Sequence, residues 1–154
     1  MADIVDHQTR SRMMAGIRGN NTKPELALRR ALHARGLRFR LHSTKVHGRP
    51  DIVFFKYNAA IFVHGCFWHR HEDCPYTTSP TTRADFWQAK FEANVARDNA
   101  VRQKLLESGW RVATVWECAV RKPAQVSASA AKLSAWLCSE ELQIEIGGNN
   151  ACRS

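Results

Sequence analysis

Apolar residues recur at helical spacing in four segments of the 154-residue chain. The helices predicted from this spacing cover residues 8–18, 22–35, 83–107 and 123–138. The second helix has the clearest boundaries, because Thr22 and Glu25 form a capping box and Pro24 fits the first turn. Gly36 and Gly109 supply stops for the second and third helices.

Other apolar segments have the patterns of β-strands. Residues 37–41 alternate between apolar and basic side chains, whereas residues 51–55, 59–64 and 110–116 are richer in continuous apolar character. The predicted order is therefore α-α-β-β-β-α-β-α, which favours an α/β fold with a small mixed sheet flanked by helices on both faces. We expect one main domain, followed by a flexible tail over residues 141–154.

The composition narrows the class of protein. Hydrophobic residues make up 44% of the chain and charged residues 24%, as in folded globular proteins. No apolar run approaches the ~20 residues of a membrane-spanning helix, and the amino terminus lacks the layout of a secretory signal. Membrane, secreted and disordered proteins are thus disfavoured, and a cytoplasmic location is expected.

Positive charge is concentrated in the first third of the chain. Residues 1–50 contain 11 Lys and Arg but three acidic residues, whereas residues 51–154 contain 12 and 11. Arginine outnumbers lysine nine to two in the first segment, and arginine makes the planar, bidentate contacts suited to phosphate. This asymmetry predicts a nucleic acid partner, with a merely solvated basic face as the alternative.

A cluster of cysteine and histidine residues predicts a structural zinc site. Cys66, His71 and Cys74 lie within nine residues, and Cys118 follows a distant predicted strand. Disulfides are disfavoured in a chain with no export signal, whereas thiolate and imidazole ligands suit tetrahedral zinc. The spacing leaves the fourth ligand open, because Cys138 or His69 could replace Cys118.

The same loop contains residues that the zinc site does not require. His64 and His69 bracket its start, and a neutral imidazole is the most available general base near pH 7. Phe67 and Trp68 lie between them, where exposed aromatic rings could stack on bases or wedge between them. The alternative is that these two rings cap the zinc site or fill the core.

Carboxylates in the sequence predict a second kind of metal site. Asp51 stands at the start of an apolar strand, where an acid is costly to bury unless it binds a cation. Nucleases use such an aspartate to hold a divalent cation at the scissile phosphate. Glu25 and Asp98 could add further carboxylates, although Asn94 and Asp98 share the apolar face of the third helix and could simply be satisfied core groups.

Five sequence motifs resemble the very short patch repair (Vsr) endonuclease family. They are GRPD at 48–51, FVHGCFWH at 62–69, TRADFW at 82–87, the Asn94 and Asp98 pair, and GWRV with WEC within 109–118. The resemblance extends over residues 5–140 and is specific, because the run HGCFWHRHEDC with the downstream WEC is not a general nuclease pattern.

The resemblance implies a restriction-endonuclease-like fold and a strand-specific nick 5′ to the T of a T:G mismatch, the product of 5-methylcytosine deamination. It further implies catalytic Mg²⁺, structural Zn²⁺, double-stranded DNA as substrate, and a MutL-type mismatch-repair protein as a partner. We also expect a monomer, located in the bacterial cytoplasm and associated with the nucleoid when acting. Residues 1–20 would form a DNA-clasping arm and residues 21–140 the endonuclease domain.

The resemblance also implies individual residue roles. The catalytic group would be Asp51 as magnesium ligand with the Val63 backbone carbonyl, His69 as general base, and His64 and Glu25 as their partners. The zinc ligands would be Cys66, His71, Cys74 and Cys118. The DNA-contacting residues would be Phe67, Trp68 and Trp87 beside the mismatch and Met14 in the opposite groove, with Asn94 and Asp98 supporting the site.

Three other functions compete with this interpretation. A zinc-stabilised DNA-binding module without catalysis would explain the charge, the zinc loop and the aromatic residues, but not Asp51 or the additional histidines. A restriction endonuclease of the same fold would cut both strands. A zinc-binding RNA nuclease would prefer single-stranded RNA.

Overall fold

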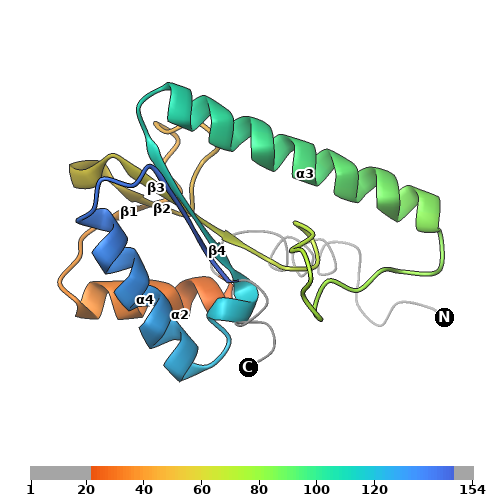
Figure 1. The fold of residues 1–154 in the computed structure, drawn as a ribbon, viewed down its shortest axis with the longest axis horizontal. Coiled ribbons are helices and arrows are strands. Elements are labelled where there is room, and N and C mark those ends of the chain that lie inside the picture. The colour runs from red at the N-terminus through yellow and green to blue at the C-terminus, as the bar shows by residue number, and fades with distance from the viewer. Residues whose placement is uncertain (1–21, 148–154) are drawn as a thin grey trace, which may run out of the picture.

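The computed structural model describes residues 22–147, which form a five-stranded mixed sheet between helices (Figure 1). The helices are α2 (Lys23–Ala34), α3 (Ala84–Glu107) and α4 (Pro123–Leu137). The strands are β1 (Arg40–Leu41), β2 (Ile52–Phe54), β3 (Ala59–His64), β4 (Arg111–Trp116) and β5 (Gln143–Ile146), and short 3-10 turns η1 (Phe55–Tyr57) and η2 (Glu117–Ala119) follow β2 and β4. The predicted mixed α/β architecture is therefore confirmed for these residues.

The strands lie in the order in which they occur along the chain. β1, β2 and β3 pair antiparallel, whereas β4 and β5 continue the sheet parallel to β3. The change of direction follows from the connections. A short turn at Asn58, in the left-handed conformation, joins β2 to β3, but a long segment containing α3 separates β3 from β4.

The two faces of the sheet are covered by different helices. α2 and α4 pack on one face and α3 lies along the other, with its amino-terminal half extending beyond the sheet above the loop that follows β3 (Figure 1). The α2–α4 face encloses the larger core, which includes Leu28, Ile52 and Leu133. The α3 face encloses a smaller one around Val53 and Leu105.

Residues close in sequence determine where α2 begins and where α2 and α3 end. The Thr22 hydroxyl accepts a hydrogen bond of 3.4 Å from the Glu25 backbone N–H, so the predicted cap is formed. Gly36 and Gly109 follow the two helices with φ of +86°, a conformation that glycine adopts without strain. The cap also orients Glu25, which is buried on the inner side of α2.

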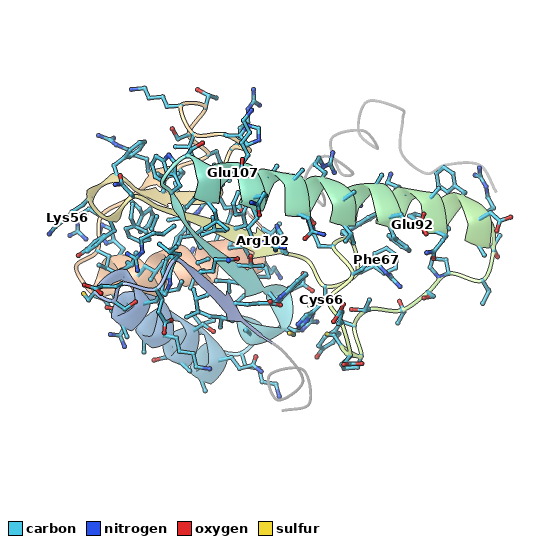
Figure 2. The ribbon with its side chains drawn as sticks, turned by 45° about the horizontal axis from the view of Figure 1, so that its top comes forward. Lys56, Cys66, Phe67, Glu92, Arg102 and Glu107 are labelled. Atoms are coloured by element: carbon cyan, nitrogen blue, oxygen red, sulfur yellow. The ribbon has the colours of Figure 1, made fainter. Side chains whose placement is uncertain are left out.

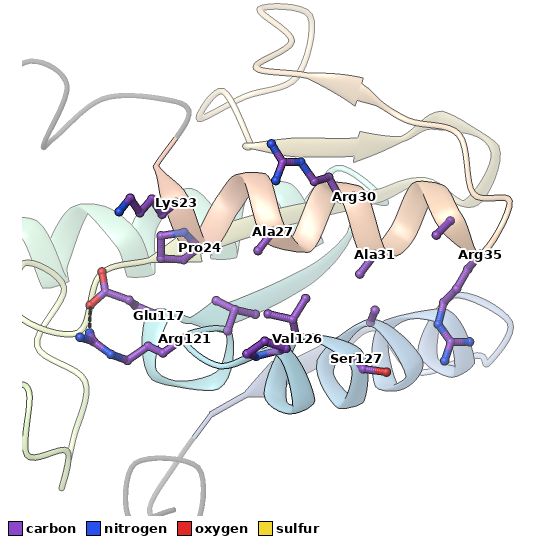
Figure 3. Close-up of a pocket in the computed structure, with 14 residues that line it drawn as sticks. Lys23, Pro24, Ala27, Arg30, Ala31, Arg35, Glu117, Arg121, Val126 and Ser127 are labelled. Atoms are coloured by element: carbon purple, nitrogen blue, oxygen red, sulfur yellow. Dashed lines mark hydrogen bonds and ion pairs between the residues drawn. The ribbon is translucent and has the colours of Figure 1, made fainter.

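A groove of about 890 Å³ runs between α2 and α4 on the outside of the molecule (Figure 3). Its floor is formed largely by small residues such as Ala27 and Ala31, and Lys23, Arg30 and Arg121 lie among its lining residues. The inner side of α2 faces the sheet, so this groove is separate from the environment of Glu25. Among residues 22–147, no helix has both the length and the apolar character needed to cross a membrane.

Two sequence predictions differ from the described structure, and a third falls outside it. The strand expected over 37–41 is limited to Arg40–Leu41, at the exposed edge of the sheet. The flexible tail expected over 141–154 is wrong for Gln143–Ile146, which pair with β4 and bury Ile146 in the larger core. The helix expected over 8–18, and with it the proposed arm over 1–20, lies outside the described residues.

Candidate active site

Two adjacent strands bring Asp51 and Val63 together. Asp51 immediately precedes β2, and the antiparallel register pairs Ile52 with Ile61 on β3. The Val63 backbone N–H donates a hydrogen bond of 2.7 Å to Asp51 Oδ2. The carboxylate is therefore held at the end of the β2–β3 hairpin, with its second oxygen directed toward neighbouring residues.

Glu25, Arg29 and His42 surround that carboxylate. Arg29 lies one helical turn after Glu25 on α2 and donates a hydrogen bond to its carboxylate. His42, in the loop after β1, lies with Nε2 3.6 Å from Glu25 Oε2 and with Nδ1 3.8 Å from Asp51 Oδ1. Burial and the neighbouring Glu25 raise the pKa of Asp51 to about 8, against the opposing effects of the Val63 N–H and Arg29.

A second group joins the end of β3 to α3. The imidazole rings of His64 and His69 are stacked, with centroids 3.9 Å apart and planes inclined by 6°. His69 Nδ1 lies 2.6 Å from Asp98 Oδ2. Burial, and then the nearby His69, lower the pKa of His64 to about 3, so His64 is neutral at ordinary pH. The contact with Asp98 leaves Nε2 of His69 available on the opposite edge of its ring.

Asn94 fixes the loop from the same helix. Its side-chain amide donates a hydrogen bond of 3.1 Å to the backbone carbonyl of Trp68. Asn94 and Asp98 are one helical turn apart on α3, so both act on the loop between Trp68 and His69. Both side chains are only half-buried and contact this loop, so the default prediction that they are satisfied core groups is wrong.

One pocket connects the two groups. Asp51, Val63, His64, His69 and Asp98 all line a cavity of about 300 Å³ between the sheet and α3. The cationic residues Arg49, Arg97 and Arg102 line it as well. A carboxylate, a stacked imidazole pair and several guanidinium groups thus face one space, which suits a phosphate-containing substrate.

The cysteine and histidine residues form a separate buried cluster. Cys66, His71, Cys74 and Cys118 are all buried, and their ligand atoms lie within 4.8 Å of one another. The Cys66 and Cys118 sulfurs lie 3.6 Å and 3.5 Å from His71 Nδ1. These four residues could hold a metal ion. Cys118, on η2 directly after β4, therefore occupies the fourth position that the sequence had left open.

The alternatives for that fourth ligand are placed elsewhere. Cys138 is exposed at the end of α4, and His69 is engaged with Asp98.

The His71 ring stacks on Trp116 at 4.3 Å, and the Trp116 indole donates a hydrogen bond of 2.6 Å to Glu145 on β5. Burial raises the pKa of the Cys66 thiol to about 12, so a metal that binds its sulfur must displace a proton.

The predicted DNA-contacting aromatic residues lie together where the loop after β3 meets the first turn of α3, which carries Trp87. The Phe67 ring centroid is 5.0 Å from that of Trp68 and 6.1 Å from that of Trp87, and Trp68 and Trp87 are 5.9 Å apart. Figure 2 shows Phe67 next to Cys66 in the loop below the projecting half of α3. All three rings are half-buried, so part of each surface remains accessible. Met14 lies outside the described residues.

Sequence reasoning missed His42 and Arg29. Arg29 could have been found, because its spacing of four residues from Glu25 is that of a helical ion pair. His42 had no such signal. It lies in a loop with φ of +45°, and only the pairing of β1 with β2 brings it beside Asp51.

Comparisons with known proteins agree on one family. The family model described as DNA mismatch endonuclease Vsr matches residues 2–75. The chain is 41% identical to the DNA mismatch endonuclease Vsr of Escherichia coli K12, over 95% of this chain and 94% of that protein. It is also 47% identical to the type II nicking enzyme V.XorIIP of Xanthomonas oryzae pv. oryzae, over 77% of this chain and 86% of that protein. Since these similarities extend through the candidate site, the chain belongs to the Vsr family of DNA mismatch endonucleases.

Proposed function

We propose that this protein is a DNA endonuclease of mismatch repair that nicks one strand 5′ to the T of a T:G mismatch, by Mg²⁺-dependent hydrolysis of the phosphodiester. The observation that carries the proposal is the single pocket lined by both Asp51 and His69. The names of similar proteins, a mismatch endonuclease and a nicking enzyme, also support the proposal. The mixed sheet flanked by helices is consistent with a restriction-endonuclease-like fold.

The donor atoms around Asp51 suit magnesium. Mg²⁺ prefers oxygen ligands and commonly takes one or two carboxylates while it keeps several waters. Asp51 and the Val63 carbonyl would hold it, and when bound it would neutralise charge on the scissile phosphate. The Val63 N–H contact fixes the orientation of the Asp51 carboxylate before the cation arrives.

His69 is the proposed general base. Its Nδ1 faces the Asp98 carboxylate at 2.6 Å, an arrangement that stabilises the tautomer with the proton on Nδ1. Nε2 is then free of a proton and can take one from the attacking water. The neutral His64 ring stacked on His69 restricts the rotation of that base without adding a competing charge.

The cysteine and histidine cluster suits structural zinc. Tetrahedral bonds of about 2.3 Å to sulfur and 2.0 Å to nitrogen place a sulfur and a nitrogen ligand roughly 3.5 Å apart. The two sulfur-to-Nδ1 distances of 3.6 Å and 3.5 Å agree with this spacing. Four protein ligands leave no open position, so this ion would tie the loop to η2 rather than take part in hydrolysis.

Mismatch preference would come from the aromatic cluster. Inserting a ring between base steps costs unstacking energy, which is smallest where pairing and stacking are already poor. Phe67, Trp68 and Trp87 would enter beside the T:G pair, with Met14 in the opposite groove on the arm formed by residues 1–20. Repair would restore the C lost by deamination of 5-methylcytosine. We further propose a monomer in the bacterial cytoplasm that cooperates with a MutL-type protein.

The test is a nicking assay with Mg²⁺ on a labelled duplex that has one T:G mismatch in a CT(A/T)GG context, beside its matched control. The expected result is cleavage of the T strand alone, 5′ to the T, with the matched duplex left intact. Binding without cleavage would indicate a non-catalytic DNA-binding module. Linear product from supercoiled plasmid would indicate a restriction endonuclease, and preferential cleavage of single-stranded RNA an RNA nuclease.

A further inference from the structure

Arg70 joins separate parts of the loop between β3 and α3. One guanidinium nitrogen, Nη1, donates hydrogen bonds to two backbone carbonyls, over 3.3 Å to that of Phe67 and 2.8 Å to that of Thr78. The other nitrogen, Nη2, donates a hydrogen bond of 2.9 Å to the hydroxyl of Ser79. Arg70 therefore connects the start of the loop, where the aromatic cluster begins, to the segment that leads into α3.

The same guanidinium packs against α3. Its carbon, Cζ, lies 4.0 Å from the ring centroid of Phe91, which is buried, and 5.7 Å from that of Phe67. The Phe67 and Phe91 rings meet edge to face, with centroids 5.2 Å apart and planes inclined by 90°. Arg70 and Phe91 thus contact both the backbone and the ring of Phe67, which restricts the rotamers that this side chain can adopt.

The backbone of Arg70 is in the left-handed conformation. Its φ is +54°, which costs free energy for a residue with a Cβ atom and persists only where surrounding contacts compensate. The hydrogen bonds and ring contacts of the guanidinium provide that compensation. Strained residues of this kind cluster at functional sites, so the position of the guanidinium calls for a functional explanation.

The contacts of Arg70 are separate from the cysteine and histidine cluster. The cluster residues link the loop to Cys118 on η2, whereas Arg70 links the loop to itself and to α3. Neither Phe67 nor Phe91 is among the four potential metal ligands. Loss of the guanidinium contacts therefore leaves the metal ligands in place.

The geometry of these contacts requires arginine rather than a positive charge alone. A guanidinium is planar and has its donors in a fixed fork, so one face can stack on a ring while the edges donate hydrogen bonds. A lysine ammonium would keep the charge of Arg70 but would have no flat face to place on Phe91. The substitution Arg70→Lys therefore separates the geometry of the side chain from its charge.

We propose that Arg70 is a positioning residue that fixes the Phe67 ring in the orientation in which it enters DNA beside the mismatch. A ring that is already ordered loses less conformational entropy on insertion than a mobile one, so it inserts more favourably. The gain is realised only where the ring inserts, and it therefore increases the preference for the mismatch. This inference rests on the proposed function for the role of Phe67.

Arg70→Lys in the zinc-loaded, full-length protein tests the inference. Fluorescence anisotropy without Mg²⁺ gives the ratio of the affinities for the T:G duplex and its matched control. A 2-aminopurine base next to the mismatched T becomes more fluorescent when it is unstacked by insertion. We expect the affinity ratio to fall about tenfold and most of the fluorescence rise to be lost. The affinity for the matched duplex and the zinc content should remain those of the wild type.

Arg121→Lys is the matched control. The Arg121 guanidinium also packs on a ring of this loop, 4.2 Å from the centroid of Tyr76, but its ion pair is with Glu117 on η2. This variant should match the wild type in every measurement. The double variant of Arg70→Lys with Phe67→Ala should lose no more preference than Phe67→Ala alone, because Arg70 acts through that ring.

Three outcomes would overturn the inference alone. They are an Arg70→Lys variant with the affinity ratio and fluorescence of the wild type, a double variant in which the two losses add, and a loss of zinc from Arg70→Lys, which would mean that Arg70 only folds the loop. Phe67→Ala detects a failure of the proposed function instead: if it keeps the mismatch preference and the fluorescence rise, Phe67 does not enter beside the mismatch. Arg70→Gln carries the same expectation for the ratio and the fluorescence if Arg70→Lys does not fold.

Discussion

The pKa of Asp51 is subject to opposing influences before any cation binds. Burial and Glu25 favour its neutral form, whereas the Val63 N–H and Arg29 favour the carboxylate. Ionisation of this half-buried acid is costly, because little water surrounds its carboxylate. A divalent cation would remove that cost, so the arrangement makes structural sense as a site that is completed on metal binding.

Replacement of Asp51 by Asn should separate DNA binding from cleavage. The amide oxygen can still accept the Val63 N–H, but the charge that would hold Mg²⁺ is lost. We expect nicking of the T:G duplex to fall by roughly 10²- to 10³-fold or more, the equivalent of several kcal/mol of transition-state stabilisation. Affinity for the mismatch, measured by fluorescence anisotropy without metal, should remain close to that of the wild type. Nicking at the wild-type rate would contradict the assignment of Asp51.

The raised pKa of Asp51 predicts how magnesium dependence changes with pH. Below pH 8 a proton occupies the carboxyl and competes with Mg²⁺, because the pKa is raised from 3.8 to about 8. The apparent dissociation constant for Mg²⁺ should therefore fall as pH rises from 6 to 8, by up to about tenfold per unit, and then level off. Nicking at limiting Mg²⁺ should rise over the same range, and saturating Mg²⁺ should shift the rise to lower pH. A magnesium affinity that is constant between pH 6 and pH 8 would rule out this competition.

At the scale of elements, the predictable parts were those with a local cause. The Thr22 cap, the Gly109 stop and the apolar run of β3 predicted their elements closely. β5 was missed, although residues 142–146 alternate between apolar and polar side chains. That short pattern beside two glycines resembles a tail, and only pairing with β4 makes it a strand.

The candidate site also contains residues whose grouping follows from local sequence and residues whose contacts do not. The grouping of Cys66, His71 and Cys74 was predictable because they lie in one loop. The role of His69 as general base stays a prediction. The pairing of His69 with Asp98 and the position of His42 depend on contacts between elements distant in sequence. Such contacts have no local pattern.

The loop between β3 and α3 depends on its link to η2. Cys118 supplies that link, and Cys66, Cys74, Trp116 and Cys118 form a small cluster apart from the two larger cores. Cys118→Ser should therefore lose the metal, from about one zinc per chain to none, and release the loop while the sheet stays folded. Elemental analysis measures the metal, and limited proteolysis should show new cleavage within residues 65–82. Cys138→Ser, at an exposed cysteine, is the matched control and should retain both. A fully metallated Cys118→Ser protein would show that Cys118 is not a ligand.

At the scale of the whole molecule, the arginine residues and the aromatic cluster lie on different surfaces. We expect each surface to serve a different part of DNA binding. Arginine residues 49, 97 and 102 line the pocket between the sheet and α3. The aromatic cluster lies where the loop after β3 meets the first turn of the same helix. Phosphate contacts provide affinity without sequence information, and contacts at the bases provide the preference. Both surfaces border α3, so we expect the duplex to approach this side and to leave the α2–α4 groove uncovered.

This division predicts that salt weakens binding without reducing mismatch preference. Affinities for the T:G duplex and its matched control should fall together between 50 and 200 mM salt, by roughly 10³-fold if about six phosphates are contacted. Their ratio should stay constant, because the aromatic contacts release no counterions. Arg97→Gln should reduce the slope of log affinity against log salt by about one, whereas Lys132→Gln, on the exposed side of α4, should leave it unchanged. Anisotropy titrations of both duplexes at several salt concentrations measure these slopes. If the ratio falls with the affinity, phosphate contacts rather than the aromatic cluster determine the preference for the mismatch.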